Sequence, residues 1–394
     1  MVPAESDPPV KRDRAVALDR DDPLSAWRDE FLVNDPGLVY LDGNSLGMTP
    51  RRTVDALQRV VTEQWAGDLI RSWWDNDWLR LPLTVGDALA PVLGARPGEV
   101  AVHDSTTVCI FQLVNAALDL GTARHVIAID AGEFPTDRYV AEGVARLRAG
   151  EMRLGFDDLD GVDVVLRSMV DYRTAEIADV AAETARAAGA GATTVWDLSH
   201  AAGVLDLDVH GLGIELAVGC TYKFLNGGPG SPAFTYVDAA LHDRLVQPIW
   251  GWFAQRDQFD MDRSFDPLDG VARLLNGTPG VLGLIGAREG IALTAEAGMT
   301  AIAAKARQLT AYGLELIDAL GLESPTPRDA ARRGGHVAVR HPEAVALHGR
   351  LEDLGIIVDK RDPDILRLGM SPLTTRYTDV YDAVIAIDEL VHIP

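Results

Sequence analysis

Residues 193–237 read TTVWDLSHAAGVLDLDVHGLGIELAVGCTYKFLNGGPGSPAFTYV, and this stretch decides the fold. One apolar run ends at Asp197, and a second leads to Lys223 and a glycine-rich turn. The first run is typical of a buried parallel strand that ends in a carboxylate. Ligands of open α/β sheets bind at that edge of the sheet. The stretch therefore predicts an α/β protein with a ligand site at the strand ends.

Lys223 stands out because the chain has four lysines, and the other 32 of its 36 basic residues are arginine. A lysine amine can lose its proton and form an imine with an aldehyde, which a guanidinium cannot do. An aspartate at a strand end can pair with a protonated pyridine nitrogen, as pyridoxal phosphate requires. Taken singly, Lys223 also fits a surface lysine, and Asp197 fits a helix cap. Together they favour a pyridoxal phosphate site.

The segments WDLSHAAG and GCTYKFLNGGPGSPAF resemble the cofactor-binding core of kynureninase of the bacterial type, a pyridoxal phosphate enzyme of the aspartate aminotransferase fold. More segments resemble this family, in the family's order, over nearly the whole chain. They are VYLDGNSLGMTPR at 39–51, IRSWWDNDW at 70–78, HDSTT at 103–107, FPTDRY at 134–139, PIWGWF at 248–253 and DKRDPDILRLGMSPL at 359–373.

The resemblance implies a large α/β domain with a mainly parallel seven-stranded sheet and a small α+β C-terminal domain. We expect an N-terminal arm and the start of the small domain in 1–45, the large cofactor-binding domain in 46–285, and the small domain in 286–394. Hydrophobic spacing and turn residues predict individual elements within this frame. The expected elements are a loose arm over 1–22, helices over 53–67, 84–95, 174–188, 281–320 and 343–355, and strands over 99–103, 125–130, 162–168, 231–237, 336–341, 356–362 and 365–371.

The implied activity is the pyridoxal 5'-phosphate-dependent hydrolysis of L-kynurenine to anthranilate and L-alanine in tryptophan catabolism. It belongs to the kynurenine pathway and to NAD biosynthesis, and 3-hydroxykynurenine is a second candidate substrate. Alternatives are a related enzyme for a modified kynurenine or another γ-keto amino acid in secondary metabolism, an aminotransferase, and a non-catalytic amino-acid sensor. A cysteine desulfurase needs a nucleophilic cysteine on a small-domain loop, and no cysteine follows Cys220.

The resemblance also assigns site residues. Lys223 would form the imine and remove the α-proton, and Tyr222 would donate a proton and contact the phosphate. The implied cofactor-binding residues are Thr106, Thr107, Phe134, Ser168, Asp197, His200, Tyr222, Lys223, Trp252 and Thr278. Asn44 and Ser45 would lie near the substrate, and Arg367 would grip its carboxylate with two N–H groups. The loops of Trp252 and Thr278 would reach the cofactor of a partner subunit, which implies a homodimer with a shared active site.

Structural roles compete with several of these assignments. Thr106, or Ser105 before it, fits a helix N-cap, and Phe134 fits a hydrophobic staple. His200 fits a satisfied core histidine, and Arg367 fits an exposed sheet arginine. The chain also departs from the family pattern in regions that could face the substrate, at Met169, Asp171, Ala175, Ala254, Gln255 and Thr374.

Composition limits the functional class. A net charge of -23 argues against nucleic acid, which needs a basic footprint. The two cysteines, Cys109 and Cys220, fit a reducing compartment, and we expect a cytoplasmic protein. No apolar run is long enough to span a bilayer, so no membrane partner is expected. No HExxH or CxxC motif occurs, so the sequence gives no support for a metal site.

Overall fold

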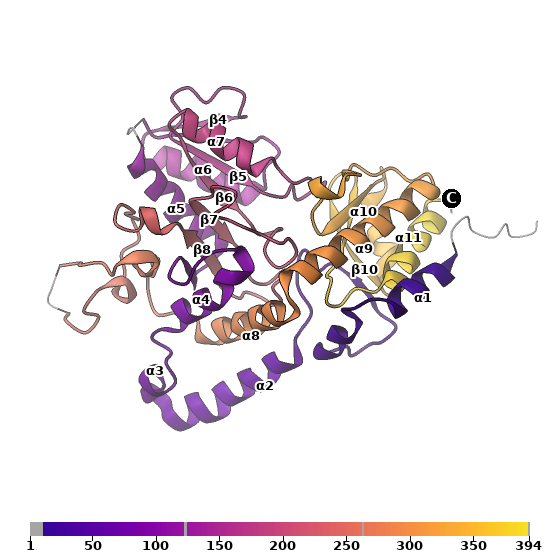
Figure 1. The fold of residues 1–394 in the computed structure, drawn as a ribbon, viewed down its shortest axis with the longest axis horizontal. Helices are drawn as coiled ribbons and strands as arrows, with labels where there is room; N and C mark the ends of the chain where they lie inside the picture. Colours follow the sequence, from indigo (N-terminus) through magenta and orange to yellow (C-terminus); the bar gives the residue numbers. More distant parts are fainter. Residues whose placement is uncertain (1–10, 122–123, 262–263, 393–394) are drawn as a thin grey trace, which may run out of the picture.

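The computed structural model describes residues 11–121, 124–261 and 264–392, and two lobes, each built on its own sheet, lie side by side in Figure 1. The larger lobe holds a seven-stranded sheet of order β2-β8-β7-β6-β5-β3-β4. Its strands are β2 (Val100–His103), β3 (Val126–Ile129), β4 (Glu151–Leu154), β5 (Val164–Ser168), β6 (Thr193–Asp197), β7 (Leu216–Gly219) and β8 (Ala233–Val237). This sheet confirms the predicted fold class.

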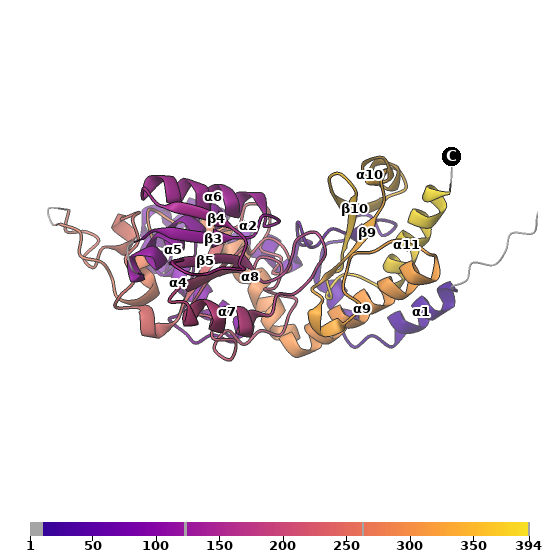
Figure 2. The ribbon, with the colours of Figure 1, turned by 90° about the horizontal axis from the view of Figure 1, so that it is seen from above.

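The strands are parallel from β4 to β7, and β8 alone runs against its two neighbours. Apart from β4 the strands are largely buried on both faces, as expected where helices cover a parallel sheet. Figure 2 shows α5 (Thr106–Leu120) and α6 (Pro135–Leu147) on one face of this sheet. The other face is covered by α4 (Leu81–Leu93), α7 (Val180–Gly189) and α8 (Val281–Ala297).

The smaller lobe holds a four-stranded sheet of order β1-β10-β11-β9. Its strands are β1 (Val39–Leu41), β9 (His336–Arg340), β10 (Ile356–Arg361) and β11 (Ile365–Gly369). Its core also includes residues from α1 (Arg12–Arg20), α9 (Met299–Ala319), α10 (Ala344–Asp353) and α11 (Tyr377–Val391). Because β1 pairs in parallel with β10, the N-terminal segment is built into the lobe that the C-terminal segment forms.

Several expected elements differ from the structure. Residues 1–10 of the expected loose arm lie outside the described residues, and residues 12–20 are a helix, because α1 packs on α11 and Arg12 pairs with Asp382. The helix expected over 174–188 begins later, at Val180, because Asp179 caps it by accepting a hydrogen bond from Ala182 N–H.

The long helix expected over 281–320 is two helices, α8 and α9, separated at Gly298. Gly298 has φ of +85°, a conformation that a residue with a Cβ rarely adopts. The predicted boundary between residues 285 and 286 falls inside α8, and the chain goes from the large lobe to the small lobe as α8 gives way to α9 in Figure 1.

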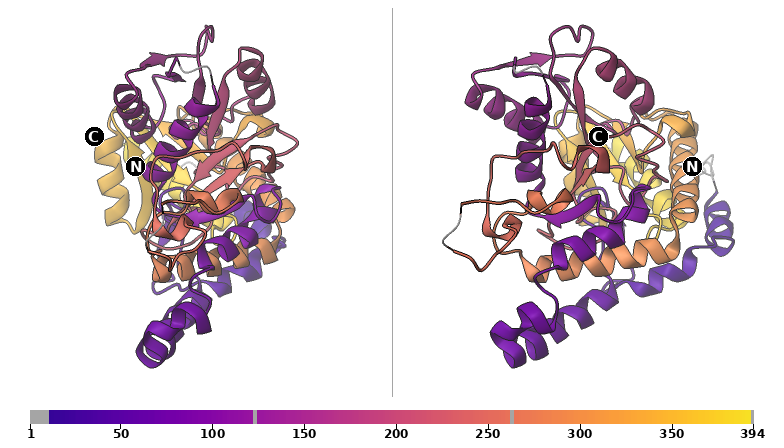
Figure 3. Two further views of the ribbon diagram at one scale, coloured as in Figure 1. Left: turned by 90° about the vertical axis from the view of Figure 1, so that its left-hand side faces the viewer. Right: turned by 60° about the vertical axis from the view of Figure 1, so that its left-hand side comes forward.

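A helical arm extends away from the body of the larger lobe in both views of Figure 3. It begins with α2 (Arg51–Arg59), widens to a π-helical winding over Val60–Asp68, and ends in a turn and the short α3 (Ser72–Asp75). Its exposed apolar side chains are Val54, Val61, Trp65, Leu69, Ile70 and Trp74. Monomeric proteins rarely expose a large apolar surface of this kind.

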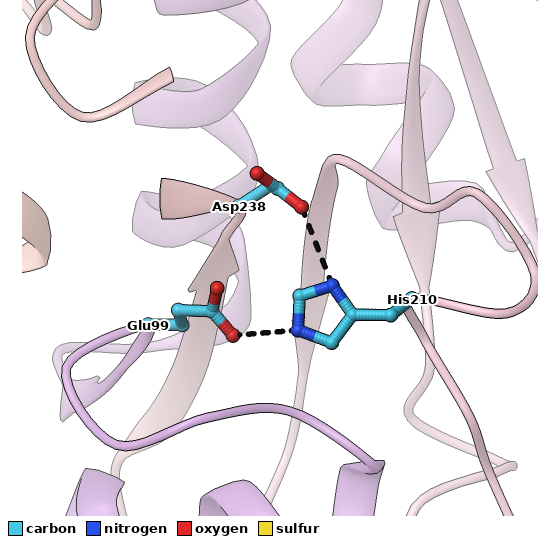
Figure 4. A group of neighbouring side chains, drawn as sticks. All are labelled: Glu99, His210 and Asp238. Atoms are coloured by element: carbon cyan, nitrogen blue, oxygen red, sulfur yellow. Dashed lines mark hydrogen bonds and ion pairs between the residues drawn. The ribbon is translucent and has the colours of Figure 1, made fainter. Parts of the chain in front are cut away.

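His210 bridges two carboxylates at the end of the large sheet that is remote from Asp197 (Figure 4). Its Nε2 lies 2.9 Å from the buried Glu99 carboxylate, and its Nδ1 lies 3.4 Å from Asp238. The three groups are close enough together to hold a metal ion. However, the two imidazole nitrogens face different carboxylates, so a metal bound to one nitrogen would have to break this bridge. The arrangement ties the loop around residue 210 to the ends of β2 and β8.

Candidate active site

A cavity of about 250 Å³ lies at the carboxyl ends of β5 and β6 and beside the turn that follows β7. This is the edge at which ligands of open α/β sheets bind. Most of the residues predicted for the site line it. They are Asn44, Ser45, Thr106, Thr107, Phe134, Ser168, Asp197, His200, Tyr222 and Lys223.

Lys223 lies in the turn after β7 rather than at the strand end, because β7 stops at Gly219. Its Nζ lies 3.1 Å from Nε2 of His200, which follows β6. Burial, together with the Lys223 charge, holds the pKa of His200 well below its ordinary value. The imidazole is therefore neutral and can accept a hydrogen bond from the lysine.

Asp197 is the last residue of β6, and its Oδ1 accepts a 2.7 Å hydrogen bond from Ser199 N–H. Burial raises the pKa of this carboxyl, and the charge of Lys223 opposes that rise. A buried carboxylate is stable when a cation lies next to it. The geometry therefore provides an acceptor for a protonated ring nitrogen, fixed in place by the backbone.

The N-terminus of α5 forms another wall of the cavity. Ser105 is the N-cap, since its hydroxyl accepts a hydrogen bond from Val108 N–H. This leaves Thr106 and Thr107 in the first helical turn, where backbone N–H groups lack intrahelical partners and the helix dipole is positive. Two hydroxyls and free N–H groups at such a position suit a phosphate group.

Phe134 and Tyr222 border the cavity with aromatic rings. Phe134 immediately precedes α6 and meets Tyr172 edge to face, with ring centroids 5.3 Å apart. The neighbouring Cys220, with burial, raises the pKa of Tyr222. The phenol therefore keeps its proton at neutral pH and can act as a donor.

The N-terminal turn containing Asn44 and Ser45 is held against the lysine loop. Gly47 N–H donates a 2.8 Å hydrogen bond to the Tyr222 carbonyl. A Cβ on Gly47 would come within 2.4 Å of the Lys223 carbonyl oxygen, so only glycine fits this contact. The turn thereby places Asn44 in the cavity with neither amide atom hydrogen-bonded to a described residue.

Arg367, on β11, is fully buried and does not line the cavity, but its Nη2 lies 3.4 Å from the hydroxyl of Ser45, which does. Its guanidinium donates to the Tyr172 carbonyl, 2.6 Å away, and pairs with Asp359. Burial lowers the pKa of Arg367 to about 10. The arginine whose side chain lines the cavity is Arg361, on the neighbouring strand β10.

Asp137 lines the cavity and was not predicted from the sequence. It is the fourth residue of the FPTD motif and lies in the first turn of α6. Its place in that motif, on the buried face of an amphipathic helix, is the signal that could have identified it. Burial, with the nearby charge of Asp197, raises its pKa well above the ordinary value. Burial therefore favours the protonated form of Asp137, next to the carboxyl of Asp197.

His336 of β9 was also missed, and it is completely buried. Its ring lies 5.8 Å from that of His200, centroid to centroid. Burial, with the charge of Arg367, holds the pKa of His336 well below the ordinary value. Neither nitrogen makes a hydrogen bond within the part of the chain that the structure describes. His336 lies within an apolar strand, and no motif around it pointed to a role in the site.

Trp252 and Thr278 lie away from this cavity. Trp252 begins a short 3-10 turn and packs on Phe253, with ring centroids 4.6 Å apart. Thr278 lines a separate cavity of about 300 Å³ together with Asp104 and Asn276. Within one chain, these two residues therefore do not join the Lys223 site.

The departures from the family pattern do not line the Lys223 cavity either, within the described residues. Met169 and Ala254 are buried, and Asp171 accepts hydrogen bonds from the backbone of Arg173 and Thr174. Thr374 is buried beside Arg28, which donates to its carbonyl. Whether these positions face the substrate of a partner subunit's site stays a prediction.

The cavity suits pyridoxal phosphate on its own chemistry. It offers a lysine amine, a buried carboxylate, an aromatic side chain and a helix N-terminus with two threonines. Buried polar atoms of Asn44, Asp137 and His200 in its wall lack hydrogen-bond partners among the described residues. Such atoms are costly unless a polar ligand or water satisfies them. The residues present therefore fit the cofactor.

Comparison with known proteins identifies the family. Residues 302–387 match the model of the kynureninase C-terminal domain. The chain is 45% identical to kynureninase from Deinococcus radiodurans, over 94% of each chain. It is 39% identical to kynureninase from Pseudomonas fluorescens, over 96% of this chain and 95% of that one. The chain belongs to the kynureninase family.

This membership confirms the predicted resemblance, and with it pyridoxal phosphate as cofactor and a hydrolase acting on a carbon–carbon bond. Solved structures of lower identity share the fold. A C-DES mutant with glycine covalently linked to its PLP cofactor superposes with a TM-score of 0.81 at 16% identity, over 92% of this chain and 99% of that one.

The apo cysteine desulfurase of Thermococcus onnurineus NA1 superposes with a TM-score of 0.75 at 19% identity, over 90% of this chain and 94% of that one. Both cysteines of the kynureninase-family chain, Cys109 and Cys220, are buried. A buried cysteine cannot serve as a nucleophile on a mobile loop. The burial of both cysteines therefore excludes the desulfurase alternative.

Proposed function

We propose that this chain hydrolyses L-kynurenine to anthranilate and L-alanine, with the residues of the Lys223 cavity in the roles described below. The observation that carries the proposal is the convergence of Lys223, Asp197, His200 and the α5 N-terminus on one cavity in a member of the kynureninase family. Bound pyridoxal phosphate supplies an aldehyde for an amine and a ring that withdraws electrons.

Lys223 would hold the cofactor through its amine, and the same amine would take up the proton from the substrate's Cα. His200 accepts a hydrogen bond from the lysine and so keeps its amine directed at the cavity. Asp197 holds the proton on the ring nitrogen, because its buried carboxylate is stabilised by a cation. Tyr222 supplies a proton from a phenol whose pKa is raised.

The remaining cavity residues bind and orient. Thr106 and Thr107 hold the phosphate at the first turn of α5, and Ser168 lies at the end of β5 beside Asp197. Phe134, in the cavity wall, would pack against the ring. Asn44 and Ser45 meet the amino acid end of the substrate, next to the arginines of the small lobe.

The enzyme acts as a homodimer with a shared active site in this proposal. Two features support it. The helical arm exposes Trp65, Ile70 and Trp74, and an apolar cavity of about 390 Å³ lies at its base. Trp252 and Thr278 lie outside the Lys223 cavity of their own chain, as expected if they serve the site of a partner.

The protein works in the cytoplasm, in tryptophan catabolism and NAD biosynthesis, in this proposal. Its cysteines, Cys109 and Cys220, are unpaired and buried, which suits a reducing compartment. Within the described ranges, every helix is too short or too polar to span a bilayer.

The activity is tested by mixing the purified protein with pyridoxal phosphate and L-kynurenine and following anthranilate fluorescence, with 3-hydroxykynurenine assayed in parallel. Rapid anthranilate release supports the proposal, and the ratio of the two rates gives the ring preference. A yellow, cofactor-loaded protein that leaves both substrates intact would overturn it and direct the search to another γ-keto amino acid.

The dimer is tested by sedimentation of the native protein and of the Trp65→Ser variant. We expect a dimer for the native chain and weaker association for the variant, because removing a large exposed aromatic group from an interface raises the dissociation constant. Lys11→Ala, outside the arm, serves as the control. A native chain that sediments as a monomer at micromolar concentration would contradict the shared site.

A further inference from the structure

Two arginines and one aspartate form a connected charged group where the small lobe meets the cavity. Asp359 and Arg367 are direct partners across the antiparallel pair of β10 and β11. Arg361 lies two residues beyond Asp359 on β10, so it projects from the same face of the sheet. The Asp359 carboxylate bridges the two guanidinium groups, with one oxygen toward Arg367 and the other 2.6 Å from Nη1 of Arg361.

The two arginines differ in access to the cavity. Arg367 is completely buried, and its Nη1 and Nη2 atoms are engaged by the Tyr172 carbonyl and by Asp359. Arg361 keeps 30% of its side chain exposed and lines the cavity. Of its donors, Nη1 alone is hydrogen-bonded to residues that the structure describes, namely Asp359 and the Lys360 carbonyl. Its Nε and Nη2 remain available to a ligand.

Two carboxylates act on the two arginines. Both guanidinium groups contact Asp359, and the charge of the nearby Asp42 opposes the burial that lowers the pKa of each arginine. Asp359 itself is fully engaged, since it also accepts hydrogen bonds from Ser45 and from Lys360 N–H. The Nε and Nη2 donors of Arg361 stay free, and a guanidinium with two free N–H groups binds a carboxylate through both oxygens.

We propose that Arg361 is a second carboxylate-binding residue, which meets the substrate's α-carboxylate at the cavity wall while Asp359 fixes it beside Arg367. The inference rests on the proposed function in that it takes the substrate to be an amino acid. Arg361 thereby selects for ligands that carry a carboxylate next to the reacting amine.

The test compares L-alanine with ethylamine, which differ by the carboxylate alone. Each is titrated into the cofactor-loaded protein, and the dissociation constant is read from the change in the visible absorbance of the cofactor. We expect Arg361→Gln to weaken L-alanine binding by about 30-fold or more, as for loss of one partner of a buried charge pair, and to leave ethylamine binding nearly unchanged. Arg361→Lys should recover part of the loss, because it restores the charge but not the paired N–H groups.

Arg173→Gln is the matched control. Arg173, in the segment after β5, also contacts the small lobe, where it pairs with Asp364, but it does not line the cavity. The control should keep the preference of the native protein for L-alanine. Both Arg361 variants must retain the absorbance of the loaded native protein, which excludes misfolding, and Arg361→Lys serves alone if the glutamine variant does not fold.

Arg361→Gln with unchanged L-alanine binding, beside Arg367→Gln that loses it, would overturn the proposal and leave Arg367 as the single clamp. Equal weakening for L-alanine and ethylamine would also overturn it, because the role would then not concern the carboxylate. A protein that keeps this discrimination but does not release anthranilate would contradict the kynurenine activity and leave the role of Arg361 standing.

Discussion

The Nζ atom of Lys223 lies 3.1 Å from Nε2 of His200, so a loop after one strand and a turn after the neighbouring strand meet at a single hydrogen bond. Because burial, with the charge of Lys223, keeps the imidazole neutral, the ring accepts this bond rather than repelling the lysine. The contact fixes the amine at the cavity wall. The chemistry of the site therefore depends on which residues the ends of neighbouring strands bring together.

Lys223→Ala should abolish the yellow colour of the loaded protein and lower turnover by about 10²-fold or more, since both aldehyde binding and proton transfer at Cα use this amine. Absorbance spectra and anthranilate release measure the two effects. Lys360→Ala, which removes a partly exposed lysine paired with Asp362, is the control and should behave as the native protein. Normal turnover by Lys223→Ala would refute the central assignment.

Asp137→Asn should stabilise the protein increasingly as the pH rises. Burial raises the folded-state pKa of Asp137, so the native state holds a proton that the unfolded state releases above its ordinary value of about 3.9. The native protein therefore loses stability as the pH rises through the folded-state pKa, and the amide variant does not. Urea unfolding at pH 5 and pH 8 measures this difference. Asp243→Asn, at an exposed position, should show no such trend.

His336→Gln should flatten the loss of stability on acidification. Burial holds the pKa of His336 well below its usual value, so the unfolded state takes up a proton below about pH 6.5 while the folded state does not. Stability is therefore lost as the pH falls from 6.5 toward the folded-state pKa. Urea midpoints at pH 7 and pH 5 give the slope, with exposed His392→Gln as control. Identical slopes for the native protein and His336→Gln would contradict the neutral state of this ring.

Lys305→Met should cost about 3–5 kcal/mol of unfolding free energy, because it leaves the buried Asp22 without its cation. The two side chains are each 5% exposed, and their charged atoms lie 2.7 Å apart. The double variant Lys305→Met with Asp22→Leu should recover much of this loss. Thermal or urea unfolding of the four proteins completes the cycle, and additive losses in the double variant would disprove the coupling.

The sequence predicted the strands that are buried on both faces, because a continuous apolar run followed by a turn is a strong local signal. It missed β4, whose residues Glu151–Leu154 are half exposed and show no apolar run. It also missed the break at Gly298, because one glycine in an alanine-rich stretch is a weak signal for the end of a helix. These features depend on what lies opposite a segment, which local sequence does not contain.

For the site, residues near the ends of β5, β6 and β7 were predictable because parallel strands deliver their ends to one edge. Asp137 and Arg361 were not selected, although both lie inside motifs that had been recognised. Arg367 was selected for the carboxylate, and nothing in its spacing reveals that Arg361 is the arginine that lines the cavity. Which of two neighbouring side chains reaches a cavity is decided by tertiary packing.

The pairing of β1 with β10 has a consequence for the order in which the protein is made. Val39 lies opposite Ile356, so the first strand to leave the ribosome waits for nearly the whole chain before it finds its partner. Until then the edge that β1 will occupy does not exist, and α1 has no α11 to cover it. Domains generally fold as units during synthesis. The seven-stranded lobe can therefore be complete before the N-terminal and C-terminal parts of the small lobe have met. Ribosome-bound chains of this family should therefore acquire their cofactor-binding sheet before they can close the site over an amino acid.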